Sequence, residues 1–137
     1  MRMRTKFYTQ EEFAQAISKA AEFEGKYNAV LDPMIITDED GVILYANDAL
    51  SQVTGFSVNE ILGRTPGEIW GNERDQGFYE EMWHTIKIEK RPFSSNVLNK
   101  KKDGTYYNCD LKIYPVLNQN KNINFFVGIV SNFEYAI

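Results

Sequence analysis

The alternation of apolar and polar residues is clearest over residues 35–47, IITDEDGVILYAN. Two apolar runs, Ile35–Ile36 and Val42–Tyr45, contain the β-branched and aromatic residues that are typical of strands. The acidic segment Asp38–Gly41 lies between them, and its Asp-Gly pair suits a tight turn because glycine adopts positive φ without strain. The pattern predicts a β-hairpin, with Asn47 placed to cap a helix that follows it.

The residues before this hairpin predict an amphipathic helix. Thr9 and Glu12 have the spacing of a capping box, which indicates where the helix begins. Apolar residues then recur at spacings of three and four, at Phe13, Ala16, Ile17, Ala20, Phe23 and Tyr27. This stripe has two interpretations that the sequence leaves open. It either covers the domain's own sheet or pairs with a second copy of the chain.

After the hairpin, the pattern predicts three short helices, at residues 48–53, 58–62 and 65–70, with Ser57 as a cap. Helices of this length bury little surface alone. We therefore expect them to lie across a sheet, where they can wall off a cavity.

A longer helix is predicted at residues 73–90, ending before Pro92. On a helical projection His84 points away from the apolar face, with Trp83 at the border. That apolar face consists of Phe78, Tyr79, Met82 and Ile86.

Residues 93–133 predict a meander of three strands, at 93–99, 105–116 and 123–133. In the middle strand one face is apolar, since polar residues alternate with Tyr107, Cys109, Leu111 and Ile113. The order of elements predicts an α+β fold with one five-stranded antiparallel sheet and its helices on one side.

Composition limits the class of protein. A length of 137 residues predicts one domain, and the formal charge of −4 with a pI near 5.0 disfavours nucleic acid as a partner. The single cysteine excludes an internal disulfide and a multi-cysteine zinc site, and it fits a cytoplasmic location. No apolar run is long enough for a signal peptide or a membrane span.

From residue 32 to about residue 132 the chain resembles a PAS domain, the sensory module common in bacterial signalling proteins. The matching segments, in that family's order and spacing, are IITDEDGVILYAN, ALSQVTGFSVNEILGRTP, GFYEEMWHTIKIEKRPF, LNKKKDGTYYNCDLKIYPVLN and FFVGIVSNF. The resemblance implies a five-stranded antiparallel sheet with short helices that enclose a ligand cavity. It divides the chain into an N-terminal helical flank, residues 1–31, and a PAS domain, residues 32–137.

One segment departs from the family pattern. Ser131-Asn132-Phe133 stands where relatives have an Asp-Ile-Thr motif that leads to the output helix. The route from this domain to an output partner is therefore left open.

The resemblance also bears on cofactors. Light-sensing relatives attach flavin through a cysteine at the position of Gly63–Pro66, which contains no thiol, so covalent flavin is not expected. Haem-binding relatives use a histidine on the long helix, but the projection of His84 favours a surface residue. Redox-sensing relatives contact noncovalent flavin through a tryptophan and an asparagine that correspond to Trp83 and Asn99. Noncovalent flavin remains open.

Seven residues are candidates for the cavity lining from this resemblance. Cys109 is also explained as a small core residue, because free cysteine is commonly buried. The candidates are Tyr45, Met82, Trp83, Ile86, Asn99, Cys109 and Leu111.

The sequence thus predicts a sensory module that binds a small molecule and signals to an output domain of the GGDEF or histidine kinase type in a longer protein. Alternatives are a noncovalent flavin redox sensor and a ligand-free module that forms a homodimer through the N-terminal helix and the outer sheet face. Enzymatic activity is not expected, because no nucleophile with a matched base is visible. The charged segments Asp38–Asp40 and Lys100–Lys102 are interpreted as solvated turns rather than a metal site or a phosphate site.

Overall fold

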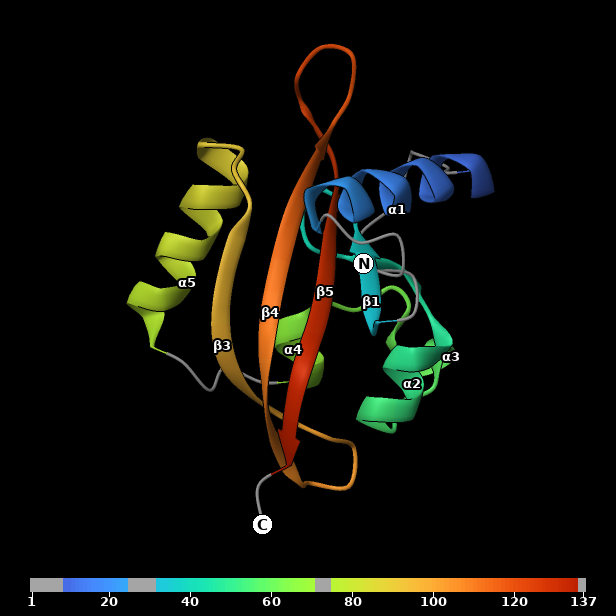
Figure 1. The fold of residues 1–137 in the computed structure, drawn as a ribbon, viewed down its shortest axis with the longest axis vertical. Coiled ribbons are helices and arrows are strands. Elements are labelled where there is room, and N and C mark those ends of the chain that lie inside the picture. Colours follow the sequence, from blue (N-terminus) through green and yellow to red (C-terminus); the bar gives the residue numbers. More distant parts are fainter. Residues whose placement is uncertain (1–8, 25–31, 71–74, 136–137) are drawn as a thin grey trace.

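One antiparallel sheet organises the chain, which a computed structural model describes over residues 9–24, 32–70 and 75–135. The elements are α1 Gln10–Glu24, β1 Met34–Thr37, β2 Ile43–Ala46, α2 Asp48–Thr54, α3 Val58–Ile61, α4 Pro66–Trp70, α5 Gln76–Trp83, the π-helical turn η2 His84–Ile88, β3 Phe93–Lys100, β4 Tyr106–Leu117 and β5 Ile123–Tyr135. The five strands lie in the order β2-β1-β5-β4-β3, and every neighbouring pair is antiparallel. Figure 1 shows β1, β5, β4 and β3 side by side. The predicted fold class is confirmed.

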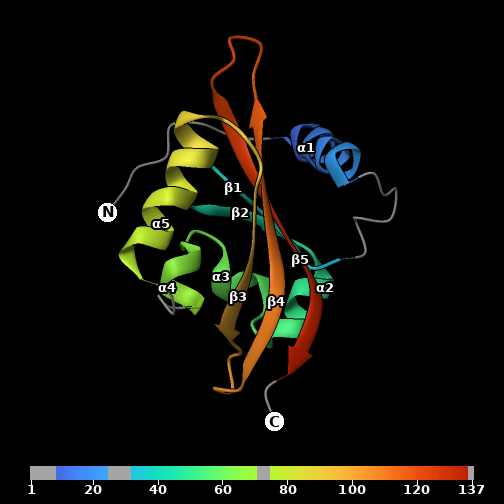
Figure 2. The same cartoon turned by 60° about the vertical axis from the view of Figure 1, so that its left-hand side comes forward.

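Helices lie on both faces of this sheet, so the prediction that all of them lie on one side was wrong for α1. Helix α1 is on one side of the strands, and α4 and α5 are on the other (Figure 2). The two faces follow from the period of two along each strand: in β5, Val127 and Ile129 face α1, whereas Phe126 and Gly128 face the opposite side. Both faces of β5 are therefore buried.

The apolar stripe of α1 packs on the domain's own sheet. Ala16 is fully buried there, and the Phe13 ring lies 5.7 Å from the ring of Phe125 and 5.9 Å from that of Tyr45. The predicted capping box is present, since Thr9 Oγ1 accepts from the Glu12 N–H at 3.1 Å. Of the two interpretations of the stripe, cover for the sheet is the observed one. The boundary at residue 31 and the side chains of Phe23 and Tyr27 lie outside the described part.

Asn47 holds three segments together. Its Oδ1 accepts from the N–H of Leu50 at 3.1 Å, as the predicted helix cap, and also from the N–H of Met34 at 3.0 Å. Its Nδ2 donates to the carbonyl of Asp32 at 2.7 Å. The side chain thus joins the start of β1, the end of β2 and the first turn of α2.

The acidic turn of the first hairpin is not solvated throughout, as the sequence had suggested. Asp38 is only 2% exposed, and its Oδ1 accepts from the N–H groups of Asp40 at 2.9 Å and Val42 at 3.0 Å. The prediction was wrong for Asp38 because the carboxylate replaces water with backbone donors of its own turn.

The β3–β4 turn is also docked rather than free. Lys102 donates its backbone N–H to the carbonyl of Thr54 at 2.9 Å, and its Nζ lies 2.8 Å from Glu60. The hydrogen bond and charge of Lys102 and the backbone of Ser57 lower the pKa of Glu60 to about 2. This turn therefore closes against α2 and α3, a tertiary contact that the run of three lysines did not indicate.

Asn47→Ala should lower the free energy of unfolding by about 2 kcal/mol, because it removes a helix cap and leaves the part-buried Met34 N–H without its acceptor. Asn47→Asp, which keeps the acceptor and loses the donor to Asp32, should cost less. Urea unfolding of both variants measures the difference. The control Asn120→Ala, at an exposed turn, should change stability by less than about 0.5 kcal/mol. Equal losses at both positions would contradict the bridging role.

Candidate functional site

A cavity of about 650 Å³ lies between the sheet and the helices. This volume is within the usual range for small-molecule sites. Strands β1, β3, β4 and β5 supply one wall through their inward side chains, and α4, α5 and η2 supply the opposite wall. Of the three short helices that the sequence predicted to wall off a cavity, α4 does so and α2 contributes Leu50, whereas α3 has no residue in the lining.

The lining is mainly apolar and aromatic. Its rings come from Trp70, Phe78, Tyr79, Trp83, Tyr107 and Phe126. Its aliphatic side chains include Ile35, Leu50, Met82, Ile86, Val97, Leu111, Ile113 and Val130. A few polar residues interrupt this surface, and of the lining side chains that the structure describes only Asp40 carries a formal charge. Such a surface suits an uncharged, largely apolar molecule with a few polar atoms.

The helical wall ends in an unusual turn. α5 passes into the π-helical turn η2, where the N–H of Glu89 donates to the carbonyl of His84 at 2.9 Å. Met82, Trp83 and Ile86 face the cavity across this transition. The predicted apolar face of the long helix is therefore correct, and the change in helical pitch lies where that face meets the cavity. Turns of this kind are frequent at functional sites.

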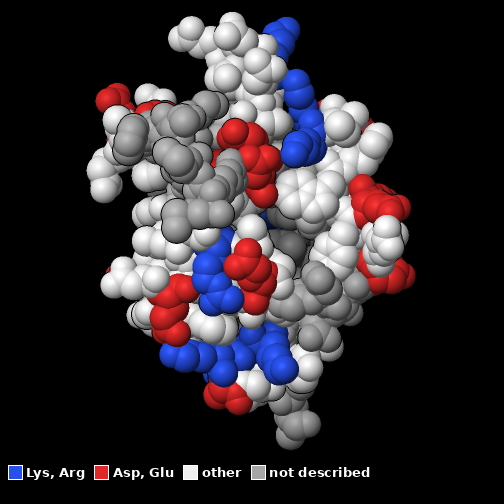
Figure 3. Space-filling view, turned by 180° about the vertical axis from the view of Figure 1, so that it is seen from behind, with Lys and Arg blue, Asp and Glu red and all other residues white. Residues whose placement is uncertain are grey.

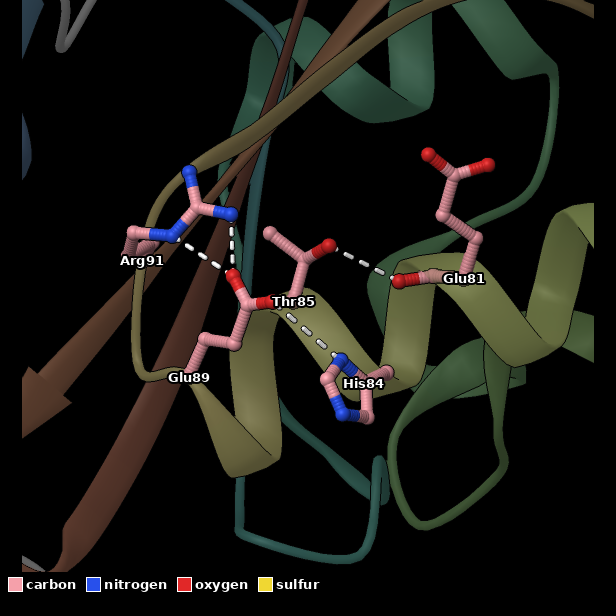
Figure 4. A network of polar contacts seen from close by, with 5 residues as sticks. All are labelled: Glu81, His84, Thr85, Glu89 and Arg91. Carbon is pink, nitrogen blue, oxygen red and sulfur yellow. Dashed lines mark hydrogen bonds and ion pairs between the residues drawn. The ribbon is translucent and has the colours of Figure 1, made fainter.

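Polar side chains gather on the outer side of this turn (Figure 4). His84 Nδ1 lies 3.4 Å from Glu89 Oε1, and the Arg91 guanidinium also pairs with Glu89. Thr85 Oγ1 donates to the carbonyl of Glu81 at 2.8 Å. Arg91 first, and then His84, hold the pKa of Glu89 below its usual range. The His84 side chain is 60% exposed and outside the lining, as the projection predicted, so it is not placed to ligate a haem in the cavity.

Trp83 contacts three parts of the molecule. Its ring packs edge-on against that of Phe126, with centroids 5.8 Å apart, and Lys87 Nζ lies 5.8 Å from the ring centroid on the solvent side. A Cβ placed on Gly41 would be 3.3 Å from Trp83 Cη2. The indole therefore packs closely against the β1–β2 turn, and a side chain at residue 41 would require it to shift.

Asn99 contributes a polar side chain to the sheet wall of the cavity. It lies on β3 opposite Tyr107, with its side chain in the lining. Within the described part of the chain its amide makes no side-chain hydrogen bond. The amide is therefore available to donate to and accept from a molecule in the cavity.

The structure brings five of the seven predicted lining residues together: Met82, Trp83, Ile86, Asn99 and Leu111. Tyr45 lies on the opposite face, under Phe13, because its register partner Ile36 faces α1. Cys109 points inward but is fully buried and outside the lining. Burial, with the neighbouring Asp110 carboxylate, raises the pKa of the Cys109 thiol to about 12, so it stays protonated and unreactive.

Several parts of the lining were missed by the sequence reasoning, and two of them show why. Phe126, Gly128 and Val130 form the inner face of β5, and the period of two in FFVGIV could have identified them. Trp70, at the end of α4, offered no comparable signal, because a helix of five residues has no clear periodicity.

Charged side chains of both signs are mixed on the face seen from behind (Figure 3). This differs from the continuous basic surface typical of nucleic acid binding. Residues 9–24, 32–70 and 75–135 contain no cluster of three or more side chains that could hold a metal ion. No helix in the same ranges has the length and hydropathy to cross a membrane.

A single antiparallel sheet with an apolar cavity beneath short helices defines a domain of the α+β class. The family model described as PAS domain matches residues 31–133. The chain therefore belongs to the PAS domain family, which confirms the resemblance seen in its sequence.

Relatives of this chain are signalling proteins. It is 30% identical over 94 residues to the nitrogen fixation regulatory protein of Klebsiella oxytoca, covering 69% of this chain and 19% of that protein. It is 32% identical over 117 residues to the blue-light-activated histidine kinase of Brucella abortus (strain 2308), covering 82% of this chain and 24% of that one. The chain thus spans about a fifth to a quarter of the length of these relatives.

Solved structures agree with the fold. The light-state structure of the blue-light photoreceptor Aureochrome1 LOV superimposes with a TM-score of 0.66 and 27% identity, over 77% of this chain and 87% of that one. An RNA-binding light-oxygen-voltage receptor superimposes with a TM-score of 0.69 over 96% of this chain and 36% of that one. At 16% identity, this second likeness concerns the fold alone.

Gly41→Ala and Gly63→Ala form a matched pair, since both glycines have positive φ, at +85° and +84°, and only Gly41 faces another side chain. Each substitution should lower the free energy of unfolding by about 1 kcal/mol through backbone strain. Only Gly41→Ala should displace Trp83, which the indole N–H resonance and tryptophan fluorescence would report. An unchanged Trp83 signal in Gly41→Ala would contradict the packing described above.

Proposed function

We propose that this domain is a sensor that holds a planar heteroaromatic ligand of the flavin type, noncovalently, in the cavity between the sheet and α5. The observation that carries this proposal is the lining itself, in which aromatic rings surround a space of about 650 Å³ and the Asn99 amide has no partner in the described part of the chain. The relative named as a blue-light-activated kinase and the LOV structure add support for a flavin.

The residues present fit such a ring. Trp83 and Phe126 offer apolar surfaces for the ring, and Asn99 offers both a donor and an acceptor for its polar edge. The only cysteine is buried with a raised pKa, which supports a noncovalent complex. When bound, a flavin would supply a redox couple and absorption of blue light.

Signalling requires that the ligand bind two arrangements of the domain with different affinity. Trp83 is suited to couple them, because its ring touches the ligand space on one side and Gly41 and Phe126 on others. A change in ligand occupancy or charge would shift the conformation of η2 through Trp83 and Ile86. Lys90 connects this region to the β4–β5 turn, because its Nζ donates to the Lys121 carbonyl at 2.7 Å.

Asn99→Ala should weaken binding of riboflavin and flavin mononucleotide by about tenfold, because an unpaired polar edge of the ring would replace a hydrogen-bonded one. Fluorescence quenching of the flavin in the purified domain measures the affinity. Asn108→Ala, on the exposed outer side of β4, is the matched control and should bind as the unsubstituted protein does. A domain that is colourless when purified and binds neither compound would overturn the flavin proposal.

The wider role is proposed from the relatives. We infer a cytoplasmic regulator in which this domain itself catalyses no reaction and controls an output domain, of the histidine kinase type in view of the Brucella relative or of the GGDEF type. The small share of those relatives that the chain spans supports an output domain elsewhere in the protein.

A homodimer through α1 is a second proposal, and it has to use the outward face of the helix because the apolar stripe is buried on the sheet. Five exposed residues form this face: Glu11, Ala14, Gln15, Ser18 and Lys19. Glu11 and Lys19 lie at equal distances in sequence from Gln15. In an antiparallel pair with a two-fold axis at Gln15, Glu11 would meet Lys19 of the partner subunit.

Charge reversal tests this arrangement. Glu11→Lys and Lys19→Glu should each weaken the dimer by about tenfold, since each change alters both copies of a symmetric contact, and the double substitution should restore it. Light scattering across a range of protein concentrations at low salt measures the mass, because salt screens exposed pairs. A monomer at every concentration, or a double variant without recovery, would rule out this dimer.

A further inference from the structure

The indole N–H of Trp70 is buried without a partner. Trp70 ends α4 and is 8% exposed, and its Nε1 has no hydrogen-bond acceptor in the part of the chain that the structure describes. The cluster around the ring is apolar and includes Ile43, Leu50 and Ile61. These side chains contain no polar atom that could accept the proton.

An unpaired donor in such surroundings has a physical cost comparable to a lost hydrogen bond. Phenylalanine would provide an aromatic ring at this position without that cost. A hydrogen-bond acceptor from outside the described chain would therefore satisfy the Trp70 indole N–H.

The cavity is the direction from which an acceptor can come, since the Trp70 ring is part of its helical wall. We infer that the ligand carries a carbonyl or ring-nitrogen acceptor that takes the Trp70 Nε1–H, while Asn99 binds another edge from the sheet wall. The indole meets this acceptor by a small turn about χ2, a soft torsion for aromatic side chains. Trp70 is then a specificity-determining residue, selecting planar heterocycles with acceptors on more than one edge.

This inference rests on the proposed function, and nuclear magnetic resonance of the indole N–H groups tests it directly. The chain has two tryptophans, so the spectrum should hold two indole N–H signals, and the one lost in Trp70→Phe is that of Trp70. On addition of riboflavin, the Trp70 signal should move downfield and exchange more slowly with solvent. A Trp70 signal that stays in place while riboflavin binds would overturn the inference.

Affinity gives the second readout. Replacing Trp70 with 3-benzothienylalanine keeps the shape of the ring and removes the donor, and it should weaken riboflavin binding by about five- to tenfold. The same replacement should leave the ligand-free domain as stable as before, or more stable, because no donor is left unpaired. Unchanged affinity together with lower stability would show that the N–H serves the fold alone, which refutes the inference.

These experiments distinguish a failure of the proposed function from a failure of the inference about Trp70. If the unsubstituted domain binds neither riboflavin nor flavin mononucleotide, the proposed function fails, and this inference fails with it. If the unsubstituted domain binds and the Trp70 variants bind equally well, the inference alone is wrong and the flavin proposal stands on Asn99 and Trp83.

Discussion

Strand β1 pairs with β5 from Met34 opposite Ile129 to Thr37 opposite Phe126, and this antiparallel ladder joins the N-terminal hairpin to the C-terminal strands. The continuous surface on each face of the sheet depends on this pairing of β1 with β5. Gly128 allows the close approach, since a Cβ at this position would lie 3.3 Å from Cγ1 of Ile35. Without this pairing, the β1–β2 hairpin and the strands β3 to β5 would each expose an apolar surface to water. The sheet could then neither pack against α1 nor form one wall of the cavity.

The opposite wall of the cavity depends on α5 and η2. Trp83 packs against Phe126 of β5 and against the turn that contains Gly41, so one side chain connects the helical wall to β5 and to the β1–β2 hairpin. The exposed group of His84, Glu89 and Arg91 surrounds the same turn from outside. Apolar packing thus holds this element on its inner side, and charge pairs hold it on its outer side.

Much of the fold could be predicted from the sequence, because its signals are local. The hairpin at residues 35–47, the cap at Asn47, the capping box of α1 and the apolar face of α5 each depend on residues a few positions apart. The candidate site was harder. Asn99 and Trp83 were found through resemblance, whereas Trp70 was missed and Tyr45 was assigned to the wrong face, since its orientation depends on the register of β2 with β1.

By itself, the sequence determined which segments become helices and strands, that one sheet forms, and that no reactive thiol lies at the position of Gly63–Pro66. These features depend on the period of the apolar residues, on turn residues and on composition, all of which are local properties of the chain. Only the tertiary structure decided that α1 covers the sheet, that Asp38 is buried while Lys102 pairs with Glu60, and that Trp70 lines the cavity with its N–H unpaired. These outcomes depend on strand register and on contacts between residues distant in sequence, which a local pattern does not specify.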